Sequence, residues 1–287
     1  MNPLAEFAAR ISDAPLAPDR GGYTLTMREC AGAEEALAVL EQEAETLDPG
    51  EMRLHLGWGS FRNLDLVAAR RSGAALLLDV NVHQVRVWEA VRAALTGSAD
   101  ASAFIGQVVP KLPHAPRLRQ FSESTPGWLR GDLERPGSWL CAARPERFRH
   151  VRELFAAGRV ATASLDLRGG SPGGRRFDFL AHELQTTGLA LDTVYLSNIP
   201  WMLAQPLGFF GENHEPFLAE PRLSPLQNVH AHLGRFIRRA RWVVSAMRLR
   251  ADASPDNLQW TTELLRPEEF FAADAWSALG LEASPRR

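Results

Sequence analysis

An apolar segment that ends in a Gly-Trp-Gly turn constrains the fold of this chain more than any other feature. The segment Met52–Asn63 reads MRLHLGWGSFRN, so Gly57 and Gly59 directly follow a strand-like run, and a helical pattern begins at Phe61. A second strand-like run ends in Asp79, at about the 20-residue spacing that separates a glycine turn from a ribose-binding acid. Strand, glycine turn, helix, strand and acid is the order in which α/β folds bind a nucleoside. The segment therefore predicts a nucleoside site.

The turn lacks the third glycine of the G-x-G-x-x-G pattern, because Arg62 occupies that position. The third glycine permits the close helix–strand packing that dinucleotide-binding turns use. S-adenosylmethionine (SAM) has no pyrophosphate and therefore does not need the third glycine. The pattern thus favours SAM over NAD or FAD as the ligand. The alternative interpretation is an ordinary strand–helix turn that uses glycine for its freedom of φ.

The composition and net charge of the chain exclude several classes of protein. The chain has 287 residues, 45% hydrophobic and 23% charged, which is typical of a globular protein. A net charge of −2 gives no electrostatic reason to expect nucleic acid as a partner, and the apolar runs are too short to span a membrane. The N-terminus does not resemble a secretory signal, and Cys30 and Cys141 lack metal-ligand spacing. We expect a cytoplasmic monomer or homodimer that binds a small-molecule substrate and no metal.

Strand-like and helical patterns alternate along most of the chain. Residues 1–50 are predicted to be a helical leader, with an amphipathic helix at Ala33–Leu47. Residues 51–287 are predicted to be one Rossmann-like domain, interrupted at about 98–137 by an irregular, proline-rich capping insertion. The alternation predicts an α/β fold with a doubly wound, mostly parallel sheet. Strands are expected at 53–58, 74–80, 139–142, 160–167, 193–198 and 241–250, and helices at 61–71, 83–95, 145–157, 177–187 and 226–239.

Ligands of such sheets bind beyond the carboxyl ends of the strands. Polar or glycine residues end four of the predicted strands, at Gly57–Gly59, Asp79, Asp166 and Ser197–Asn198. Because the carboxyl ends of parallel strands share one edge of a sheet, we expect these four groups to form one site.

These motifs resemble class I SAM-dependent methyltransferases and, more narrowly, an uncharacterised bacterial family of that fold. The family has a G-x-G turn followed by an asparagine, here Asn63, and an apolar strand LLLD followed by Asn81. A segment like Ser138–Val160 and a strand ending in Y-x-S-N, here Tyr195–Asn198, follow. The resemblance covers about residues 53–203. The chain departs from it after the Ser-Asn pair, where Ile199-Pro200 replaces the family's Val-Glu.

The resemblance implies roles for individual residues. Gly57 and Gly59 would back the amino-acid portion of SAM, and Asp79 would hold the ribose hydroxyls. Asp166 would meet the adenine amino group, with Leu167 against the ring. The implied cofactor-binding set is Gly57, Trp58, Gly59, Asn63, Asp79, Asn81, Asp166 and Leu167.

The strand ending in Ser197 and Asn198 holds the candidate substrate-orienting residues. Asn198 to Trp201 partly matches the N-P-P-(Tyr/Phe/Trp) motif of amine-methylating enzymes. The same residues could instead cap a helix that begins with proline. Tyr195, Trp201 and Trp58 offer aromatic faces to a cationic sulfonium. The candidate catalytic residues are Tyr195, Ser197, Asn198 and Trp201.

The favoured function is therefore SAM-dependent methyl transfer to a nitrogen or oxygen of a small molecule, in which positioning is the main catalytic device. One alternative is transfer of the 3-amino-3-carboxypropyl arm of SAM with release of methylthioadenosine, including cyclisation to azetidine-2-carboxylate. A second alternative is a non-catalytic protein that binds SAM or a nucleoside.

Overall fold

The computed structural model describes residues 3–12, 32–48, 50–79, 82–112, 127–164, 182, 184, 188–197, 234, 236–249 and 260–272. The chain divides into two compact units. Residues 1–28 and 34–165 form the first unit, and residues 29–33 and 166–287 form the second. Most residues of the predicted helices at 177–187 and 226–239 lie outside the described residues.

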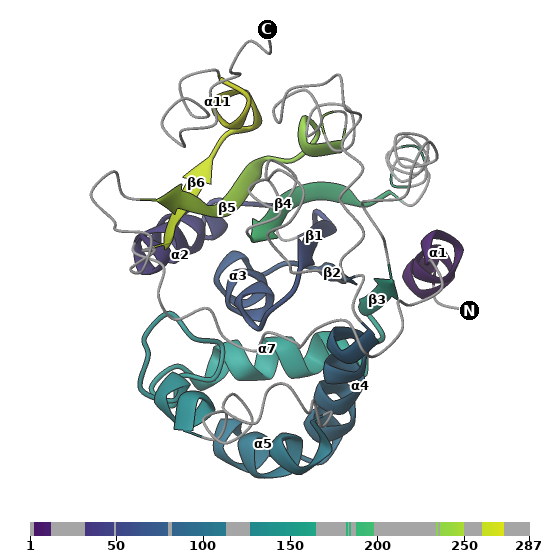
Figure 1. Cartoon of the computed structure of the whole chain (residues 1–287), viewed down its shortest axis with the longest axis vertical. Coiled ribbons are helices and arrows are strands. Elements are labelled where there is room, and N and C mark those ends of the chain that lie inside the picture. The colour runs from purple at the N-terminus through teal and green to yellow at the C-terminus, as the bar shows by residue number, and fades with distance from the viewer. Residues whose placement is uncertain are drawn as a thin grey trace, which may run out of the picture. The chain divides into compact units, whose positions relative to one another are not determined.

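The strands belong to a mostly parallel sheet in the order β3-β2-β1-β4-β5-β6 (Figure 1). The pairs β1–β2, β2–β3 and β4–β5 are parallel, and β6 is antiparallel to β5. This topology confirms an α/β fold with a Rossmann-like strand order. The strands are β1 (Arg53–Trp58), β2 (Ala74–Asp79), β3 (Val160–Ser164), β4 (Ala190–Ser197), β5 (Trp242–Leu249) and β6 (Trp260–Leu265).

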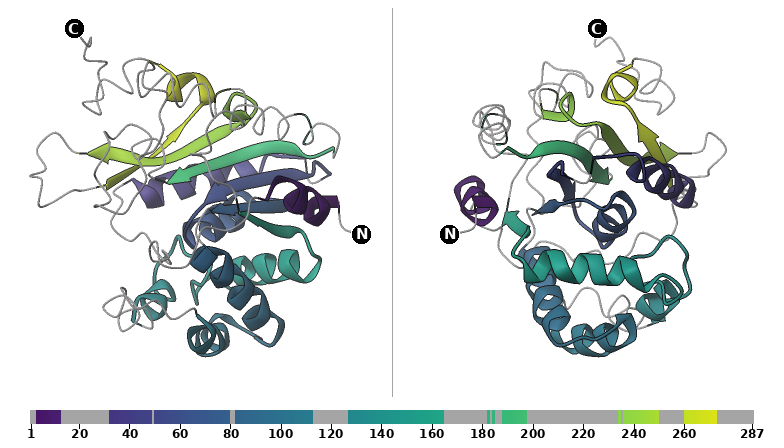
Figure 2. Two further views of the ribbon diagram at one scale, coloured as in Figure 1. Left: turned by 45° about the vertical axis from the view of Figure 1, so that its right-hand side comes forward. Right: turned by 180° about the vertical axis from the view of Figure 1, so that it is seen from behind.

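In the first unit, helices cover one face of β1, β2 and β3. Side chains that alternate along the strands, among them Ala75, Leu77 and Val160, share one hydrophobic core with α3, α4, α5 and α7. These helices lie together on one side of the three strands in both views of Figure 2. The helices of this unit are α1 (Pro3–Ile11), α2 (Ala33–Ala44), α3 (Arg62–Arg70), α4 (Val82–Thr96), α5 (Ala101–Val108) and α7 (Pro145–Ala156).

The leader contains the two helices α1 and α2. The apolar side chains of α1 recur at helical spacing, and Leu4, Phe7 and Ile11 are all buried. α1 packs against β3, which ends the strand order on that side. Covering an edge strand with a helix protects its unpaired backbone groups from pairing with other chains.

Two local predictions are wrong. The insertion at about 98–137 contains helix α5 and further helical residues at 127–132. The α5 helix begins after Asp100, whose carboxylate accepts the Ala103 N–H at 2.8 Å and thereby caps the helix. Residues 139–142 form turns instead of a strand, because the Trp139 and Leu140 N–H groups donate to the side chains of Asp65 and Ser138.

The second unit contains β4, β5, β6 and the short helix α11 (Pro267–Phe270). The Arg266 guanidinium lies 3.6 Å from the centroid of the Trp242 ring, a cation–π contact. Its Nη1 also donates to the Arg241 carbonyl at 3.2 Å. Arg266 therefore links the start of α11 to the start of β5.

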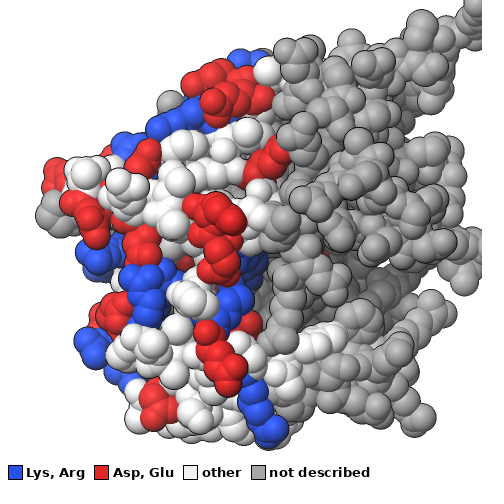
Figure 3. All heavy atoms as spheres, turned by 90° about the vertical axis from the view of Figure 1, so that its left-hand side faces the viewer, with Lys and Arg blue, Asp and Glu red and all other residues white. Residues whose placement is uncertain are grey.

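Charged side chains of both signs are interspersed over the described atoms of the face in Figure 3. Within the described part of the chain, no helix is both long and apolar enough to cross a bilayer.

Candidate functional site

The turn after β1 is held by the side chain of Asn63, which is fully buried. Its Nδ2 donates to the Trp58 carbonyl at 3.1 Å and to the Ser60 carbonyl at 2.8 Å. Since both amide hydrogens are donated to carbonyls, Oδ1 is the acceptor in the 3.0 Å contact with His55 Nε2. We therefore assign the ring proton to His55 Nε2. Asn63 fixes the shape of the turn, and its predicted role as a ligand contact stays a prediction.

The two glycines of the turn are required for different physical reasons. A Cβ at Gly57 would overlap the Asn63 Oδ1, so the close approach of α3 to β1 requires glycine there. Gly59 has a φ of +81°, in the left-handed region that favours glycine. Among the described residues other than its two chain neighbours, none has an atom within 4 Å of the place where a Cβ at Gly59 would stand. The described residues thus leave the space beside Gly59 open.

Three neighbouring strands bring polar groups to one edge of the first unit. The Gly59 N–H donates to the Leu78 carbonyl at 3.4 Å, which places the turn directly beside the end of β2. Asp79 ends β2 and pairs in register with Ser164, the last residue of β3. Gly59, Asp79 and Ser164 therefore follow one another across the carboxyl edge of β1, β2 and β3, where ligands of such sheets bind.

At the ends of β1 and β3, two buried polar atoms make no hydrogen bond to the described residues. They are the indole Nε1 of Trp58 and the hydroxyl Oγ of Ser164. Trp58 is 5% exposed and Ser164 is 6% exposed. An unsatisfied buried polar group costs about 1–3 kcal/mol, so each of these two atoms calls for a physical explanation.

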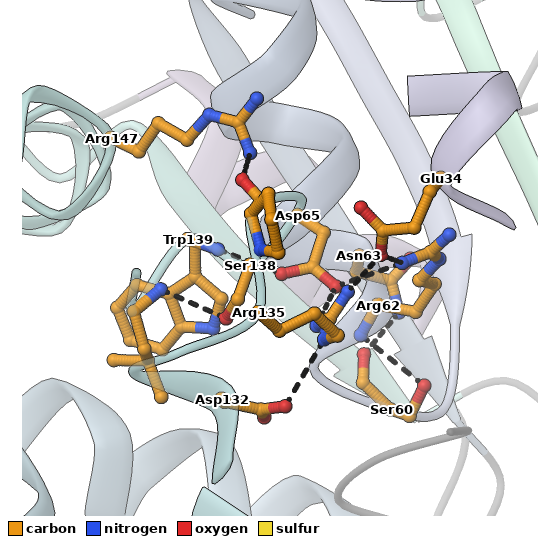
Figure 4. Close-up of polar contacts among 12 residues, drawn as sticks. Glu34, Ser60, Arg62, Asn63, Asp65, Asp132, Arg135, Ser138, Trp139 and Arg147 are labelled. Carbon is orange, nitrogen blue, oxygen red and sulfur yellow. Dashed lines mark hydrogen bonds and ion pairs between the residues drawn. The ribbon is translucent and has the colours of Figure 1, made fainter. Parts of the chain in front are cut away.

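Arg62, in the position of the missing third glycine, is part of a buried ionic cluster (Figure 4). Its Nη1 lies 3.2 Å from the Asp65 carboxylate, one turn along α3. The same carboxylate accepts Arg135 Nη2 at 2.7 Å and the Trp139 backbone N–H at 2.9 Å. The Asp65 side chain is only 2% exposed. Asp65 thus ties α3 to the segment that leads into α7.

Further carboxylates surround the Arg135 guanidinium. Arg135 lies 3.2 Å from Asp132 and 2.9 Å from Glu34 of α2. Burial lowers the pKa of Arg135, but the charges of Asp65 and Asp132 outweigh burial and raise it above its ordinary value. Arg135 therefore stays charged, and its hydrogen bonds stabilise the fold.

A second ionic cluster holds α2 against α7. The Glu41 carboxylate accepts Arg144 Nη2 at 2.6 Å and Arg147 Nη2 at 2.8 Å. Burial raises the pKa of Glu41, but the hydrogen bonds and charges of the two arginines outweigh it and lower the pKa. The sequence analysis missed both clusters, since their partners lie as far as 106 residues apart along the chain.

The predicted substrate-orienting residues belong to the second unit. Tyr195 is buried in β4. The ladder between β4 and β5 shifts register between Tyr195 and Ser197, and Ser197 has a φ of +51°. A left-handed backbone at a residue other than glycine is uncommon and clusters at functional sites.

The remaining predicted site residues, Asn81, Asp166, Leu167, Asn198 and Trp201, lie outside the described residues.

Across the described residues, no group of three or more His, Cys, Asp or Glu side chains could hold a metal ion. No protein-family model matches the chain, and no curated protein matches it. The geometry that the chain does show is an α/β sheet with a glycine turn beside an acid at its carboxyl edge.

Proposed function

We propose that this chain is a SAM-dependent transferase that moves a methyl group to a nitrogen or oxygen of a small molecule. The observation that carries the proposal is the pairing of the Gly57–Gly59 turn with Asp79. The two lie at the carboxyl ends of adjacent parallel strands. A strand order ending in an antiparallel strand, β3-β2-β1-β4-β5-β6, is methyltransferase-like and supports the same proposal.

The turn suits a nucleoside without a pyrophosphate. The packing of Gly57 against Asn63 brings the start of α3 close to β1 without a third glycine. Arg62, in the third-glycine position, is buried and paired with Asp65. A dinucleotide-binding turn uses that position for glycine, so SAM is the better match to this chain.

Asp79 and Gly59 would divide the recognition of the nucleoside. A carboxylate accepts hydrogen bonds only, and it can accept one from each ribose hydroxyl of SAM. The open space beside Gly59 would admit the amino-acid portion of SAM against the backbone. These contacts would fix the sulfonium, and fixed geometry is what an in-line methyl transfer needs most.

The candidate substrate-orienting residues lie in the second unit. Ser197 supports this role through its left-handed backbone and the register shift beside it. Tyr195, Asn198 and Trp201 stay candidates on the sequence motif alone.

The experiment is to incubate the purified protein with methyl-deuterated SAM, with and without a bacterial small-molecule extract, and to identify the nucleoside product by mass spectrometry. The proposal predicts S-adenosylhomocysteine that appears only with the extract, together with a deuteromethylated small molecule. Methylthioadenosine would instead establish aminocarboxypropyl chemistry. Binding of SAM without either product would identify a non-catalytic SAM-binding protein.

A further inference from the structure

The buried hydroxyl of Ser164 makes none of the described hydrogen bonds that stabilise the fold. Ser164 is the last residue of β3, it is 6% exposed, and its Oγ finds no hydrogen-bond partner among the described residues. A serine hydroxyl both donates and accepts, and it rotates freely to find a partner. A hydroxyl left without one at the ligand edge of the sheet points to a ligand.

Ser164 faces the same side of the sheet as Asp79. The two residues are in-register partners on the parallel strands β2 and β3, and paired residues on neighbouring strands present their side chains to the same face. Leu77 and Ala75, which alternate with the intervening leucines along β2, lie in the core on that face. Neighbouring strands are about 4.8 Å apart, so the two side chains stand side by side.

The backbone of Ser164 is held in place by α1. The Ser164 N–H donates to Ser12 Oγ at 3.3 Å, and that hydroxyl donates in turn to the Ala8 carbonyl at 2.8 Å. The Ser164 hydroxyl is therefore displayed from a fixed backbone, as a group that positions a ligand must be.

The two side chains have complementary hydrogen-bonding abilities. The Asp79 carboxylate can only accept, and the Ser164 hydroxyl can also donate. A ligand hydroxyl between them would donate to Asp79 and accept from Ser164, so that its hydrogen and one of its lone pairs are both satisfied. An ether oxygen could accept from Ser164 but could not donate to Asp79, and a C–H could do neither.

We infer that Asp79 and Ser164 jointly bind one ribose hydroxyl, so that Ser164 makes the site selective for ribonucleosides over the matching deoxynucleoside. The inference rests on the proposed function, because it takes the adenosine moiety of SAM as the ligand. It adds a specificity-determining residue and a defined hydrogen bond to that site.

The test is isothermal titration calorimetry with S-adenosylhomocysteine and with its 2′-deoxy and 3′-deoxy analogues. For Ser164→Ala, we expect S-adenosylhomocysteine to bind about tenfold more weakly, as loss of one hydrogen bond implies. The deoxy analogue that lacks the shared hydroxyl should bind Ser164→Ala and the unsubstituted protein equally. Ser164→Cys preserves the size of the side chain but has only a weak donor, and it should show the same loss.

Ser72→Ala is the matched control. Ser72 is also fully buried, and its Oγ also has no partner within the described part of the chain, but it lies before the amino end of β2. It should bind all three ligands as the unsubstituted protein does. Undiminished binding by Ser164→Ala, or an equal loss for all three ligands, would overturn the inference while leaving the proposed function intact. If S-adenosylhomocysteine does not bind the unsubstituted protein, the proposed function fails and the inference fails with it.

Discussion

Replacing Asp65 by asparagine should destabilise the protein severely while preserving the shape of the side chain. The Asp65 carboxylate accepts hydrogen bonds from two arginines and one backbone N–H, with its side chain 2% exposed. In Asp65→Asn the remaining oxygen can still accept the Trp139 N–H, but the amide nitrogen would then face the guanidinium groups of both Arg62 and Arg135. Two cations would then lack their shared counter-charge.

The magnitude follows from these contacts. Hydrogen bonds to charged groups contribute about 1.5–3 kcal/mol each, and removal of one partner of a buried ion pair costs about 3–5 kcal/mol. Arg135 is 26% exposed and also pairs with Glu34 and Asp132, so it keeps part of its stabilisation. We therefore expect a loss of about 3 kcal/mol in the free energy of unfolding, at the lower end of the range for buried pairs.

Urea denaturation followed by tryptophan fluorescence measures this loss. With a slope of about 3 kcal/mol per molar urea, the midpoint should fall by about 1 M. The matched control is Glu146→Gln, which removes an exposed ion pair to Arg144 at 3.5 Å and should cost less than about 1 kcal/mol. A midpoint for Asp65→Asn that matches the control would refute the view that this cluster stabilises the first unit.

Three further predictions follow from the turn and from a buried histidine. Gly57→Ala should lower the free energy of unfolding by about 3 kcal/mol, because the new methyl group overpacks the site and displaces the hydrogen-bonded Asn63. An unchanged urea midpoint would contradict this prediction. Gly59→Ala should lower the free energy of unfolding by only about 1–2 kcal/mol, the strain of a left-handed alanine, since no atom of the described residues obstructs its Cβ. A loss as large as that of Gly57→Ala would be inconsistent with the open space. Burial lowers the pKa of His150, and its contact with the Ser72 carbonyl offsets this only in part. As the pH falls below about 6.5, the unfolded chain takes up a proton that the folded chain does not, so stability falls. His150→Gln should weaken that pH dependence between about pH 7.5 and about pH 5.5, and an identical dependence in both proteins would exclude His150 as its source.

The sequence predicted the centre of the fold well because the signals there are local. The strands at 53–58 and 74–80 and the helix at 61–71 correspond to β1, β2 and α3 within two residues. Continuous apolar runs bounded by glycine and a terminal acid are typical of buried parallel strands. In the insertion, proline and serine concealed α5, although the Asp100 cap before an apolar run was a usable signal.

The contacts that hold the site together could not be predicted in the same way. The bond from Arg135 to Asp65 joins residues 70 positions apart, and no local pattern marks two such residues as partners. No local pattern marks Ser164 either. Its role is inferred from its register with Asp79 and from its hydroxyl, which makes no hydrogen bond to the described residues. The sequence analysis assigned the ligand contact at the end of this strand to Asp166, two residues beyond Ser164, which lies outside the described residues.

The most direct test of the account is a calorimetric titration of the protein with SAM, repeated with Asp79→Asn. Asparagine preserves the size of the side chain but replaces one accepting oxygen with a donor and removes the charge. The account predicts saturable binding of SAM that weakens at least about tenfold in Asp79→Asn, the loss expected for one charged hydrogen bond. Equal binding by both proteins, or no binding to the unsubstituted protein, would contradict the assignment of the Gly57–Gly59 turn and Asp79 as a nucleoside site.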